Sequence, residues 1–337
     1  MEHQAPPQSA VMHIIAGYWL SRAVYLAARL KLADAVGENG AALETLASAT
    51  GTRPDRLQRL LRALASHGFF RQQPDGTFVQ TPLSQTLRSG VPASMRALAE
   101  AELGHDHYES WRDIEGCLRA GGTAFERQYG MPIWRYYAET PDAGALFGEA
   151  MTSFTAIANA GILGSYKFNS FAKAVDIGGG HGSFLLSILE QQPNTKGILF
   201  DLPTVVAEVE KKGVPEPYRG RVEVSAGDFF QSVPAGGDLY LLKFILHDWD
   251  DEHAIKILTN VRRAIDPKGR LAVIEIVLPP HNEPHLGPLI DLNMMVMTGG
   301  AERTEAGYRE LLARAGFRLD RVVATKSPFS VIEAVPQ

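Results

Sequence analysis

The chain has 337 residues and a formal net charge of −5, and 45% of its residues are hydrophobic while 21% are charged. These values are typical of a globular protein long enough for two domains, and they exclude a disordered chain. The slight acidic excess gives no overall attraction to nucleic acid or to an anionic membrane, so neither is an expected partner. The one cysteine, Cys117, cannot form an internal disulfide, and the N-terminus lacks a signal-peptide pattern, which predicts a cytoplasmic protein.

The N-terminal region opens with an apolar segment over residues 11–36. Its hydrophobic side chains recur at helical spacing and predict one amphipathic helix. A membrane span is not expected, because Arg22, Arg29 and Lys31 interrupt the segment before about 20 apolar residues accumulate. The predicted helix has more apolar surface than a small domain can cover alone.

Two further helices are predicted over residues 43–50 and 53–66, with Thr52 as the N-cap of the second. Two β-prone runs follow at residues 69–72 and 77–80, joined by a Pro-Asp-Gly turn that is typical of hairpins. Helix, helix and hairpin in this order indicate a winged-helix domain.

A long helical region is expected from about residue 93 to residue 165, after Pro82 and the Gly90-Val91-Pro92 breaker. Its expected interruptions are Gly121-Gly122, Gly130-Met131-Pro132 and Thr140-Pro141. The Gly-Val-Pro breaker before this region places a domain boundary near residue 95. The predicted domains are therefore residues 1–95 and 96–337.

After residue 168 short apolar strands alternate with helices. The predicted strands are residues 174–177, 197–201, 221–225, 239–244 and 271–277, with two closing strands near 319–324 and 330–335. The predicted helices are residues 183–190, 205–211, 251–265 and 305–315. This alternation predicts an α/β fold built on a parallel sheet with helices on both faces.

A glycine-rich turn follows the first of these strands, over the run from Gly178 to Gly182. Because Ser183 starts a helix, the backbone can turn tightly and approach a ligand at the helix N-terminus. Turns of this kind bind NAD, FAD and S-adenosylmethionine alike, and many are plain turns. The surrounding residues must therefore identify the cofactor.

Three later segments place polar or aromatic side chains at the ends of neighbouring strands. Asp201 lies 23 residues after Gly178, where a doubly wound fold puts a carboxylate for two ribose hydroxyls, and a helix cap is the alternative. Asp228 offers an acceptor for an adenine amino group beside the ring of Phe229, or forms a solvated turn. Lys243 ends a strand where a buried lysine needs an anionic partner, such as the carboxylate of the cofactor's methionine.

Five motifs in this order resemble those of the plant-type small-molecule O-methyltransferases and their bacterial relatives in natural-product pathways. They are Val175 to Gly180, Phe200 to Pro203, Gly227 to Phe229, Lys243 to Trp249, and Gly299 to Thr304. The resemblance covers nearly the whole chain. It implies a Rossmann-like class I methyltransferase domain with S-adenosylmethionine as cofactor, preceded by a winged-helix dimerisation domain. The cofactor-binding residues that it implies are Gly178, Gly180, Asp201, Leu202, Asp228, Phe229 and Lys243.

Methyl transfer to a phenol needs a base, because a phenol with a pKa of about 10 is mostly protonated at neutral pH. His247 lies between a strand and a helix, and imidazole titrates near neutral pH, although a lone histidine is more often structural. The resemblance implies that His247 is the catalytic base and that Glu275 and Glu302 flank its ring. Glu275 lies inside a predicted strand, where an unpaired charge is costly unless the strand is at an edge. For Glu302 the alternatives are a surface pair with Arg303 or replacement by Glu305, and the family register favours Glu302.

The segment from His247 to His253 is also rich in side chains that bind metals. The two histidines are six residues apart and share no helix face, so no metal is predicted. Asp250 and Asp251 are instead expected to start a helix.

The resemblance also implies an acceptor pocket for a flat aromatic molecule, between a helical cap and the Rossmann-like core. Methionine and aromatic side chains suit such a ring, although methionines at helical spacing more often fill a core. The implied pocket residues are Trp134, Met151, Phe154, Asp248, Asn293, Met294 and Met297. The surplus apolar surface of the N-terminal helix implies a homodimer, in which His13 and Tyr18 are candidates to reach the partner's pocket.

The predicted function is transfer of a methyl group from S-adenosylmethionine to a hydroxyl of an aromatic small molecule. Within the fold, the alternatives are C- or N-methylation, or a reaction other than methyl transfer that uses the bound cofactor. An alternative of another class is a winged-helix regulator that senses a ligand. It would explain residues 42–80 but not His247, Glu275 and Glu302.

Overall fold

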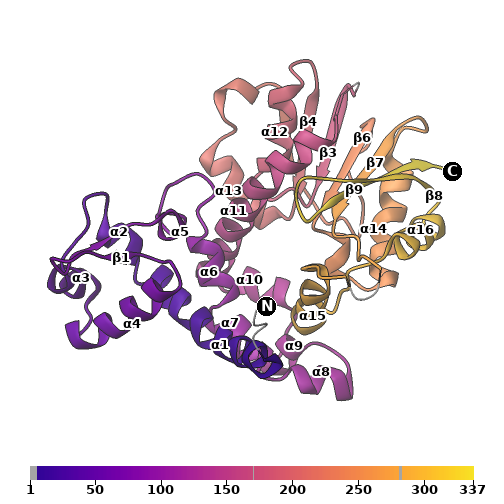
Figure 1. Cartoon of the computed structure of the whole chain (residues 1–337). Helices are drawn as coiled ribbons and strands as arrows, with labels where there is room; N and C mark the ends of the chain where they lie inside the picture. Colours follow the sequence, from indigo (N-terminus) through magenta and orange to yellow (C-terminus); the bar gives the residue numbers. More distant parts are fainter. Residues whose placement is uncertain (1–5, 170, 281–282) are drawn as a thin grey trace, which may run out of the picture. The chain divides into compact units, whose positions relative to one another are not determined.

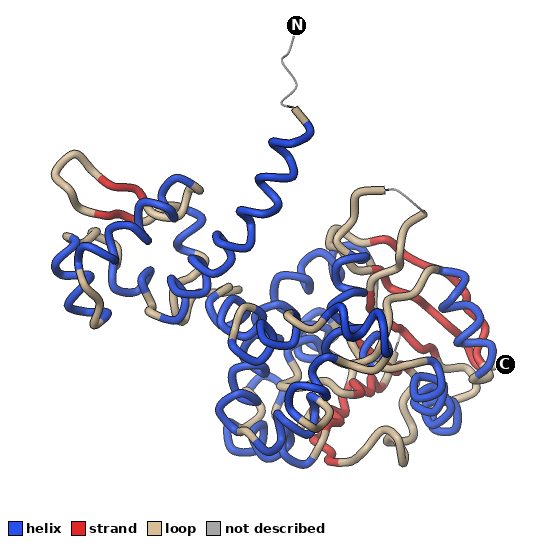
Figure 2. The backbone as a smooth tube through the Cα atoms, turned by 90° about the horizontal axis from the view of Figure 1, so that it is seen from below, coloured by secondary structure: helices blue, strands red, loops and turns tan. Residues whose placement is uncertain are grey.

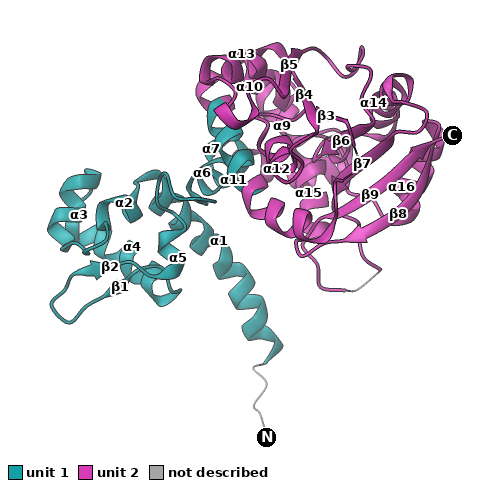
Figure 3. Cartoon of the chain, turned by 90° about the horizontal axis from the view of Figure 1, so that it is seen from above, with its two compact units in different colours: residues 1–108, 145–154 teal, residues 109–144, 155–337 magenta. Residues whose placement is uncertain are grey.

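The structure is a computed structural model that describes residues 6–169, 171–280 and 283–337. The chain divides into two compact units (Figure 3). The first unit comprises residues 1–108 and 145–154, and the second comprises residues 109–144 and 155–337. The boundary predicted near residue 95 falls within the first unit.

The first unit consists of helices and one small hairpin. Its helices are α1 (Pro7–Arg29), α2 (Leu32–Val36), α3 (Leu43–Thr50), α4 (Pro54–Ser66), α5 (Pro82–Gln85), α6 (Arg96–Glu102), the first residues of α7 (His105–Trp111) and the middle of α11 (Pro141–Ser165). Strands β1 (Arg71–Gln72) and β2 (Phe78–Val79) pair antiparallel. The predicted order of helix, helix and hairpin is present.

Two local predictions for this unit are wrong. The helix expected over residues 11–36 is interrupted, because Lys31 adopts a left-handed conformation with a φ of +51° between α1 and α2. Thr52 does not cap α4: Arg53 holds the N-cap position without a side-chain hydrogen bond. The hydroxyl of Thr52 instead lies 2.9 Å from that of Thr50.

The core of the first unit lies among α2, α3, α4 and the hairpin, whereas α1 is largely uncovered. Leu46, Leu61 and Phe78 are at most 1% exposed, while the buried residues of α1 are Ala27 and Ala28. In Figure 2 the amino-terminal half of α1 extends away from the other helices of its unit. The exposed apolar residues of that half are Val11, Met12, Ile14, Ile15, Tyr18 and Trp19. Among the described helices α1 alone is long and apolar enough to cross a membrane, a test that core helices of soluble proteins also pass.

The second unit is built on a seven-stranded sheet in the order β5-β4-β3-β6-β7-β9-β8 (Figure 1). The strands are β3 (Lys173–Ile177), β4 (Lys196–Asp201), β5 (Val222–Ala226), β6 (Leu239–Lys243), β7 (Arg270–Glu275), β8 (Phe317–Ala324) and β9 (Ser330–Pro336). Its other α-helices are α8 (Ile114–Ala120), α9 (Ala124–Tyr129), α10 (Ile133–Glu139), α12 (Ser183–Gln191), α13 (Pro203–Lys212), α14 (Asp251–Ala264), α15 (Gly287–Met297) and α16 (Glu305–Arg314). Two 3₁₀ turns, η1 (Glu216–Tyr218) and η2 (Leu246–Asp248), complete it. The predicted α/β class is confirmed.

One edge of the sheet differs from the all-parallel prediction. Strands β3 to β7 pair in parallel, but β9 is antiparallel to both β7 and β8. The five residues 325–329 connect β8 to β9, and a parallel pair needs a crossover of a dozen or more residues. The short connection therefore forces the antiparallel hairpin.

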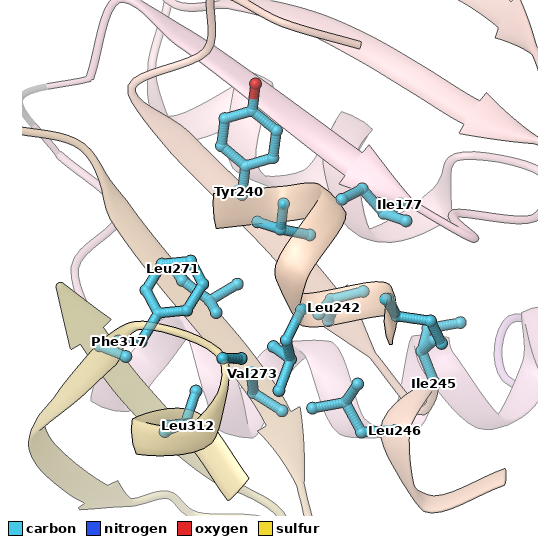
Figure 4. Packing of buried hydrophobic residues seen from close by; sticks show 14 of the residues in the cluster. Ile177, Tyr240, Leu242, Ile245, Leu246, Leu271, Val273, Leu312 and Phe317 are labelled. Atoms are coloured by element: carbon cyan, nitrogen blue, oxygen red, sulfur yellow. The ribbon is translucent and has the colours of Figure 1, made fainter. Parts of the chain in front are cut away.

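The sheet order places a topological switch point beside β3, which has β4 on one side and β6 on the other. The loops after β3 and β6 leave the same edge in different directions, and ligands of open α/β sheets bind at such points. The core beneath this edge fixes the loop after β6. Figure 4 shows Ile245 and Leu246 beside Leu242, and all three are at most 9% exposed.

Candidate active site

The turn after β3 brings backbone rather than side chains to the carboxyl edge of the sheet. Gly178 and Gly180 have φ values of +65° and +58°, which glycine tolerates best. A Cβ at Gly178 would lie 2.5 Å from Cδ1 of Ile245, whereas a Cβ at Gly180 would meet nothing within 4 Å. The turn therefore leaves open space at Gly180, shortly before the start of α12.

Asp201 connects the end of β4 to this turn. Its Oδ2 atom accepts the Gly180 N–H at 2.7 Å, and Oδ1 accepts the Leu202 N–H at 2.7 Å. Burial raises the pKa of Asp201, and these two N–H groups oppose the shift. Leu202, rather than Asp201, holds the N-cap position of α13, and its side chain is 43% exposed. A carboxylate and an accessible apolar side chain thus lie together beside the glycine turn.

Asp228 and Phe229 follow the end of β5, which pairs with β4. The Gly227 N–H donates to the backbone oxygen of Asp201 at 2.9 Å, so the two strand ends are adjacent. The Asp228 carboxylate accepts the Phe230 N–H at 2.8 Å. The backbone oxygen of Phe229 accepts from the Asn260 amide at 2.8 Å. These contacts hold Asp228 in a turn at the carboxyl edge.

A buried polar cluster lies at the ends of β3 and β6. Lys243 donates from Nζ to the Thr155 hydroxyl at 2.6 Å, and the same nitrogen is 3.9 Å from the centre of the Phe244 ring. Asp176 is 1% exposed, and its Oδ2 atom has no hydrogen-bond partner among the residues that the structure describes. Burial raises the pKa of Asp176 and lowers that of Lys243, while attraction between the two opposes both shifts. A buried carboxyl oxygen of this kind suits a ligand that brings N–H groups.

His247 lies in η2 and is held between two carboxylates. Its Nδ1 atom is 2.7 Å from Oε1 of Glu302, and its Nε2 atom is 3.9 Å from Oδ1 of Asp248. Burial disfavours the charged imidazole, but Asp248 and Glu302 outweigh it and raise the pKa of His247 to about 10. Burial raises the pKa of Asp248 to about 7, against the attraction of His247. The neutral imidazole of His247 is therefore a strong base, and the charged form predominates at neutral pH.

The structure places Glu302, rather than Glu305, against His247. Glu302 is 5% exposed, and its backbone N–H donates to Oδ1 of Asp291 at 2.8 Å. Glu305 starts α16 and pairs with Arg309 at 2.6 Å on the exposed side. The alternative of a surface pair between Glu302 and Arg303 does not appear among their described contacts, because Arg303 pairs with Asp251 instead.

Glu275, at the end of β7, is fully buried. Its hydrogen bonds join the backbone that carries His247 and the hydroxyl of Tyr308. Arg303 donates to the backbone oxygens of Leu246 and Trp249 at 3.0 and 2.9 Å. These two side chains therefore fix both ends of η2.

Most of the predicted pocket residues lie in the second unit. Met297 and Trp134 share one hydrophobic cluster, and the Trp134 ring is 6.4 Å from that of Trp249, the neighbour of Asp248. Asn293 and Met294 lie with Met297 on α15, where Oδ1 of Asn293 accepts the indole N–H of Trp111 at 2.8 Å. By contrast, Met151 and Phe154 belong to the part of α11 that packs within the first unit.

Sequence reasoning singled out the strand ends but gave no role to several buried polar side chains near them. Asp176 lay within a selected motif but received no role of its own, and Thr155, Arg303 and Tyr308 were not selected as site residues. A charged residue at the end of an apolar strand could have indicated Asp176. Thr155 and Tyr308 carried no such signal, because helical threonines and tyrosines are common. Across the described ranges, no three His, Cys, Asp or Glu side chains are grouped as metal ligands, and Asp250 caps α14 by accepting the His253 N–H.

Comparison with known proteins relates both units to one family. The O-methyltransferase domain matches residues 111–318, and the O-methyltransferase dimerisation domain matches residues 12–90. The chain is 40% identical to the phenazine O-methyltransferase PhzM of Lysobacter antibioticus, over 98% of this chain and 97% of that protein. It is 38% identical to the 3-amino-4-hydroxybenzoate 4-O-methyltransferase of Streptomyces cremeus, over 95% of this chain and 88% of that protein.

Solved structures agree with this relationship. The crystal structure of LaPhzM superimposes with a TM-score of 0.95 at 40% identity, covering 99% of this chain and all of that one. The matched domains, the fold and the sequence identity agree over nearly the whole length. The resemblance inferred from the five motifs is therefore confirmed, and the chain belongs to the O-methyltransferase family.

Proposed function

We propose that this enzyme transfers the methyl group of S-adenosylmethionine to a hydroxyl of an aromatic small molecule, with His247 as the general base. The observation that carries the proposal is the contact between the largely buried imidazole of His247 and the buried carboxylate of Glu302. Such a pair matches the arrangement of a base and the group that orients it. Family membership supports the reaction type.

The geometry assigns a task to each nitrogen of His247. A carboxylate accepts hydrogen bonds, so Glu302 holds the proton on Nδ1 and leaves the Nε2 lone pair for the proton of the acceptor hydroxyl. When the imidazole takes that proton, Glu302 and Asp248 stabilise its positive charge. Bound S-adenosylmethionine would supply the methyl group on its sulfonium, and the sulfur would depart as the neutral thioether of S-adenosylhomocysteine when the acceptor oxygen bonds the methyl carbon in line.

The residues at the carboxyl edge fit this cofactor. Space is open at Gly180, and the unpartnered oxygen of buried Asp176 suits an ammonium group. We assign Asp201 to the ribose hydroxyls, Asp228 and Phe229 to the adenine, and Lys243 to the methionine carboxylate. Gly178, Gly180 and Leu202 then line the same site.

Asp201→Asn is expected to raise the Kd for S-adenosylmethionine at least tenfold. Hydrogen bonds to a charged group contribute about 1.5–3 kcal/mol, and an amide nitrogen would face one of the two N–H donors that the carboxylate now accepts. Isothermal titration calorimetry measures the change. Asp238→Asn is the matched control, because Asp238 also accepts two backbone N–H groups at 2.7 Å, from Ala172 and Lys173 at the opposite end of the sheet. Equal affinities for the Asp201 variant and the wild type would rule out the assignment.

The acceptor pocket is proposed to hold a flat ring with polar substituents. Methionine side chains adapt to aromatic surfaces, and α15 carries Met294 and Met297. Trp134 and Asp248 of the same unit complete the proposed set, and Met151 and Phe154 stay predictions from the sequence. Because the Trp111 indole N–H occupies Oδ1 of Asn293, the Nδ2 group is the donor left for a carbonyl, carboxylate or ring nitrogen.

The activity with a phenolic acceptor is expected to depend on pH through His247. Only the neutral imidazole can accept a proton, and the pKa of His247 is raised to about 10, so kcat/KM at saturating cofactor should increase from about pH 6 to 9. Glu302→Gln removes a neighbouring negative charge, which lowers the pKa of His247 and moves the midpoint to lower pH. Rates measured from about pH 6 to 11, a range that includes the expected wild-type midpoint, test the sign. A midpoint that is unchanged, or moves to higher pH, contradicts the assigned role of Glu302.

The dimerisation domain supports a second proposal, that the exposed face of α1 is buried against another copy in a homodimer. Ile14→Asp should convert the dimer to monomer, because Ile14 is 77% exposed in the single chain and charge in an apolar interface is costly. Sedimentation velocity measures the state. Leu118→Asp, at a 69% exposed leucine of the second unit, is the control and should leave it unchanged. An Ile14 variant that sediments as the wild type does would overturn the assigned interface.

The reaction itself is tested by incubating the purified enzyme with S-adenosylmethionine and a library of phenols, aminophenols and aromatic carboxylic acids. The proposal predicts a product heavier by one CH₂ unit, because a methyl group replaces the hydroxyl hydrogen, and NMR should place the new carbon on oxygen. If every product carries the new methyl group on nitrogen or carbon, the enzyme is an N- or C-methyltransferase and the proposed O-methylation is wrong. Salt-dependent DNA binding without any methylated product would favour the regulator instead.

A further inference from the structure

Glu275 binds the backbone of the segment that carries His247. Its Oε1 atom accepts three consecutive N–H groups, from Ile245 at 3.1 Å, Leu246 at 2.6 Å and His247 at 3.2 Å. Its Oε2 atom accepts the hydroxyl of Tyr308 at 2.5 Å. Both oxygens of this fully buried carboxylate are therefore used to hold other parts of the site.

The backbone before His247 has the shape that gathers these three donors. Phe244 is left-handed, with a φ of +58°, and Ile245 follows with φ and ψ of −120° and −52°. Turn conformations can point successive N–H groups into one concavity, which binds an anion. A left-handed phenylalanine is unfavourable without such a partner. The carboxylate of Glu275 supplies the anion from within the chain.

Tyr308 orients that carboxylate from the opposite side. It is fully buried at the start of α16, and its hydroxyl also lies 3.3 Å from the backbone oxygen of Ile276. Burial, and then the charge of Glu275, raise the pKa of Tyr308 well above its ordinary value, so the hydroxyl keeps its proton as a donor. The contact fixes the rotation of the Glu275 side chain, and hence the position of Oε1.

We propose that Glu275 and Tyr308 are positioning residues, which place His247 through its backbone rather than by acting on its ring. The inference rests on the proposed role of His247 as the base. The sequence analysis gave Glu275 and Glu302 the same role beside the His247 ring. In the proposal the two roles differ: Glu302 contacts the imidazole, and Glu275 contacts the peptide N–H groups of the segment. The charge of Glu275 also adds to the rise in the pKa of His247, but its hydrogen bonds go to the backbone and not to the ring. Glu275→Gln and Glu275→Leu both remove that charge, so the difference between them measures the hydrogen bonding alone.

The test compares kcat and cofactor affinity in Tyr308→Phe, Glu275→Gln and Glu275→Leu. Tyr308→Phe should lower kcat about tenfold, with an unchanged Kd for S-adenosylmethionine and an unchanged pH midpoint. Glu275→Gln keeps an oxygen that can accept the three N–H groups, and should retain at least tenfold more kcat than Glu275→Leu. Wild-type kcat in Tyr308→Phe, or equal losses in the two Glu275 variants, would overturn the inference.

Controls separate positioning from a general loss of stability. Tyr240→Phe removes another buried hydroxyl, which donates to the backbone oxygens of Pro234 and Ala264 at 2.6 and 3.0 Å, and should leave kcat unchanged. Cofactor binding by calorimetry identifies variants that are folded, and only these are compared. If Glu275→Leu does not fold, Tyr308→Phe against Tyr240→Phe decides the matter. If His247→Ala keeps wild-type turnover, the proposed function is wrong. If His247→Ala loses activity but Tyr308→Phe has wild-type kcat, only the positioning role is wrong.

Discussion

His247→Ala is expected to lower kcat for a phenolic acceptor by about 10²- to 10⁴-fold, the usual contribution of a general base. The variant removes the Nε2 nitrogen that is proposed to take the acceptor proton, and with it the partner of Glu302. The Kd for S-adenosylmethionine should stay within about twofold of the wild type, because the proposed cofactor residues come from the turns after β3, β4 and β5 and from the end of β6. Single-turnover methyl transfer and calorimetry measure the two quantities.

His253→Ala is the control for this variant. His253 lies six residues after His247 in the sequence. Its side chain is half-exposed and pairs with Asp250. It should keep wild-type turnover. If the His247 and His253 variants are equally active, the imidazole of His247 takes no part in the reaction.

Gly300→Ala should be the second most damaging change, although it adds a single methyl group. A Cβ at this position would lie 2.0 Å from the backbone oxygen of His247, 2.4 Å from the carbonyl carbon of Asp248 and 2.5 Å from the nitrogen of Trp249. These are backbone atoms, so the segment that carries His247 must move. Overpacking of this kind costs about 1–3 kcal/mol of unfolding free energy, and a displacement of about 1 Å at a catalytic group can cost 10²-fold in rate.

Chemical denaturation and steady-state kinetics check both consequences. Gly164→Ala is the matched control: it lies in helix α11, and a Cβ there would meet nothing within 4 Å. It should be neutral or slightly stabilising, because alanine favours helix more than glycine does. A Gly300→Ala variant with wild-type stability and kcat would mean that the backbone at Gly300 does not pack against residues 247–249 as described.

The order of the elements and most of the site could be predicted from the sequence. Alternating apolar strands and helices predicted the sheet, and the Gly178 turn with Asp201 predicted its carboxyl edge. These features are local, because a strand, its turn and the next helix are continuous in the chain. The relation of Glu302 to His247 came from the family register rather than from spacing, since 55 residues separate them.

What could not be predicted depends on contacts between distant segments. The positive φ of Phe244 has no sequence signal, because phenylalanine rarely adopts it and Glu275 compensates for it from another strand. No helix was predicted at α15. It starts at a Gly-Pro pair, and its apolar residues, interrupted only by Asp291 and Asn293, are spread around the helix instead of forming the one apolar face of an amphipathic helix. By contrast, the antiparallel pairing of β8 and β9 could have been predicted, because the five residues between the two predicted strands are too few for a parallel crossover.

Proton removal by His247 is tested most directly with a series of acceptors that differ only in the pKa of the reacting phenol. The measurement is the ratio of kcat/KM for the wild type to that for His247→Ala, at saturating S-adenosylmethionine and pH 9, where part of the His247 population is neutral. The ratio should be large for a phenol with a pKa of about 10 and fall towards one as substituents bring the phenol pKa below 7, because an ionised acceptor needs no base. A ratio that stays constant across the series would contradict the role of His247 as the base.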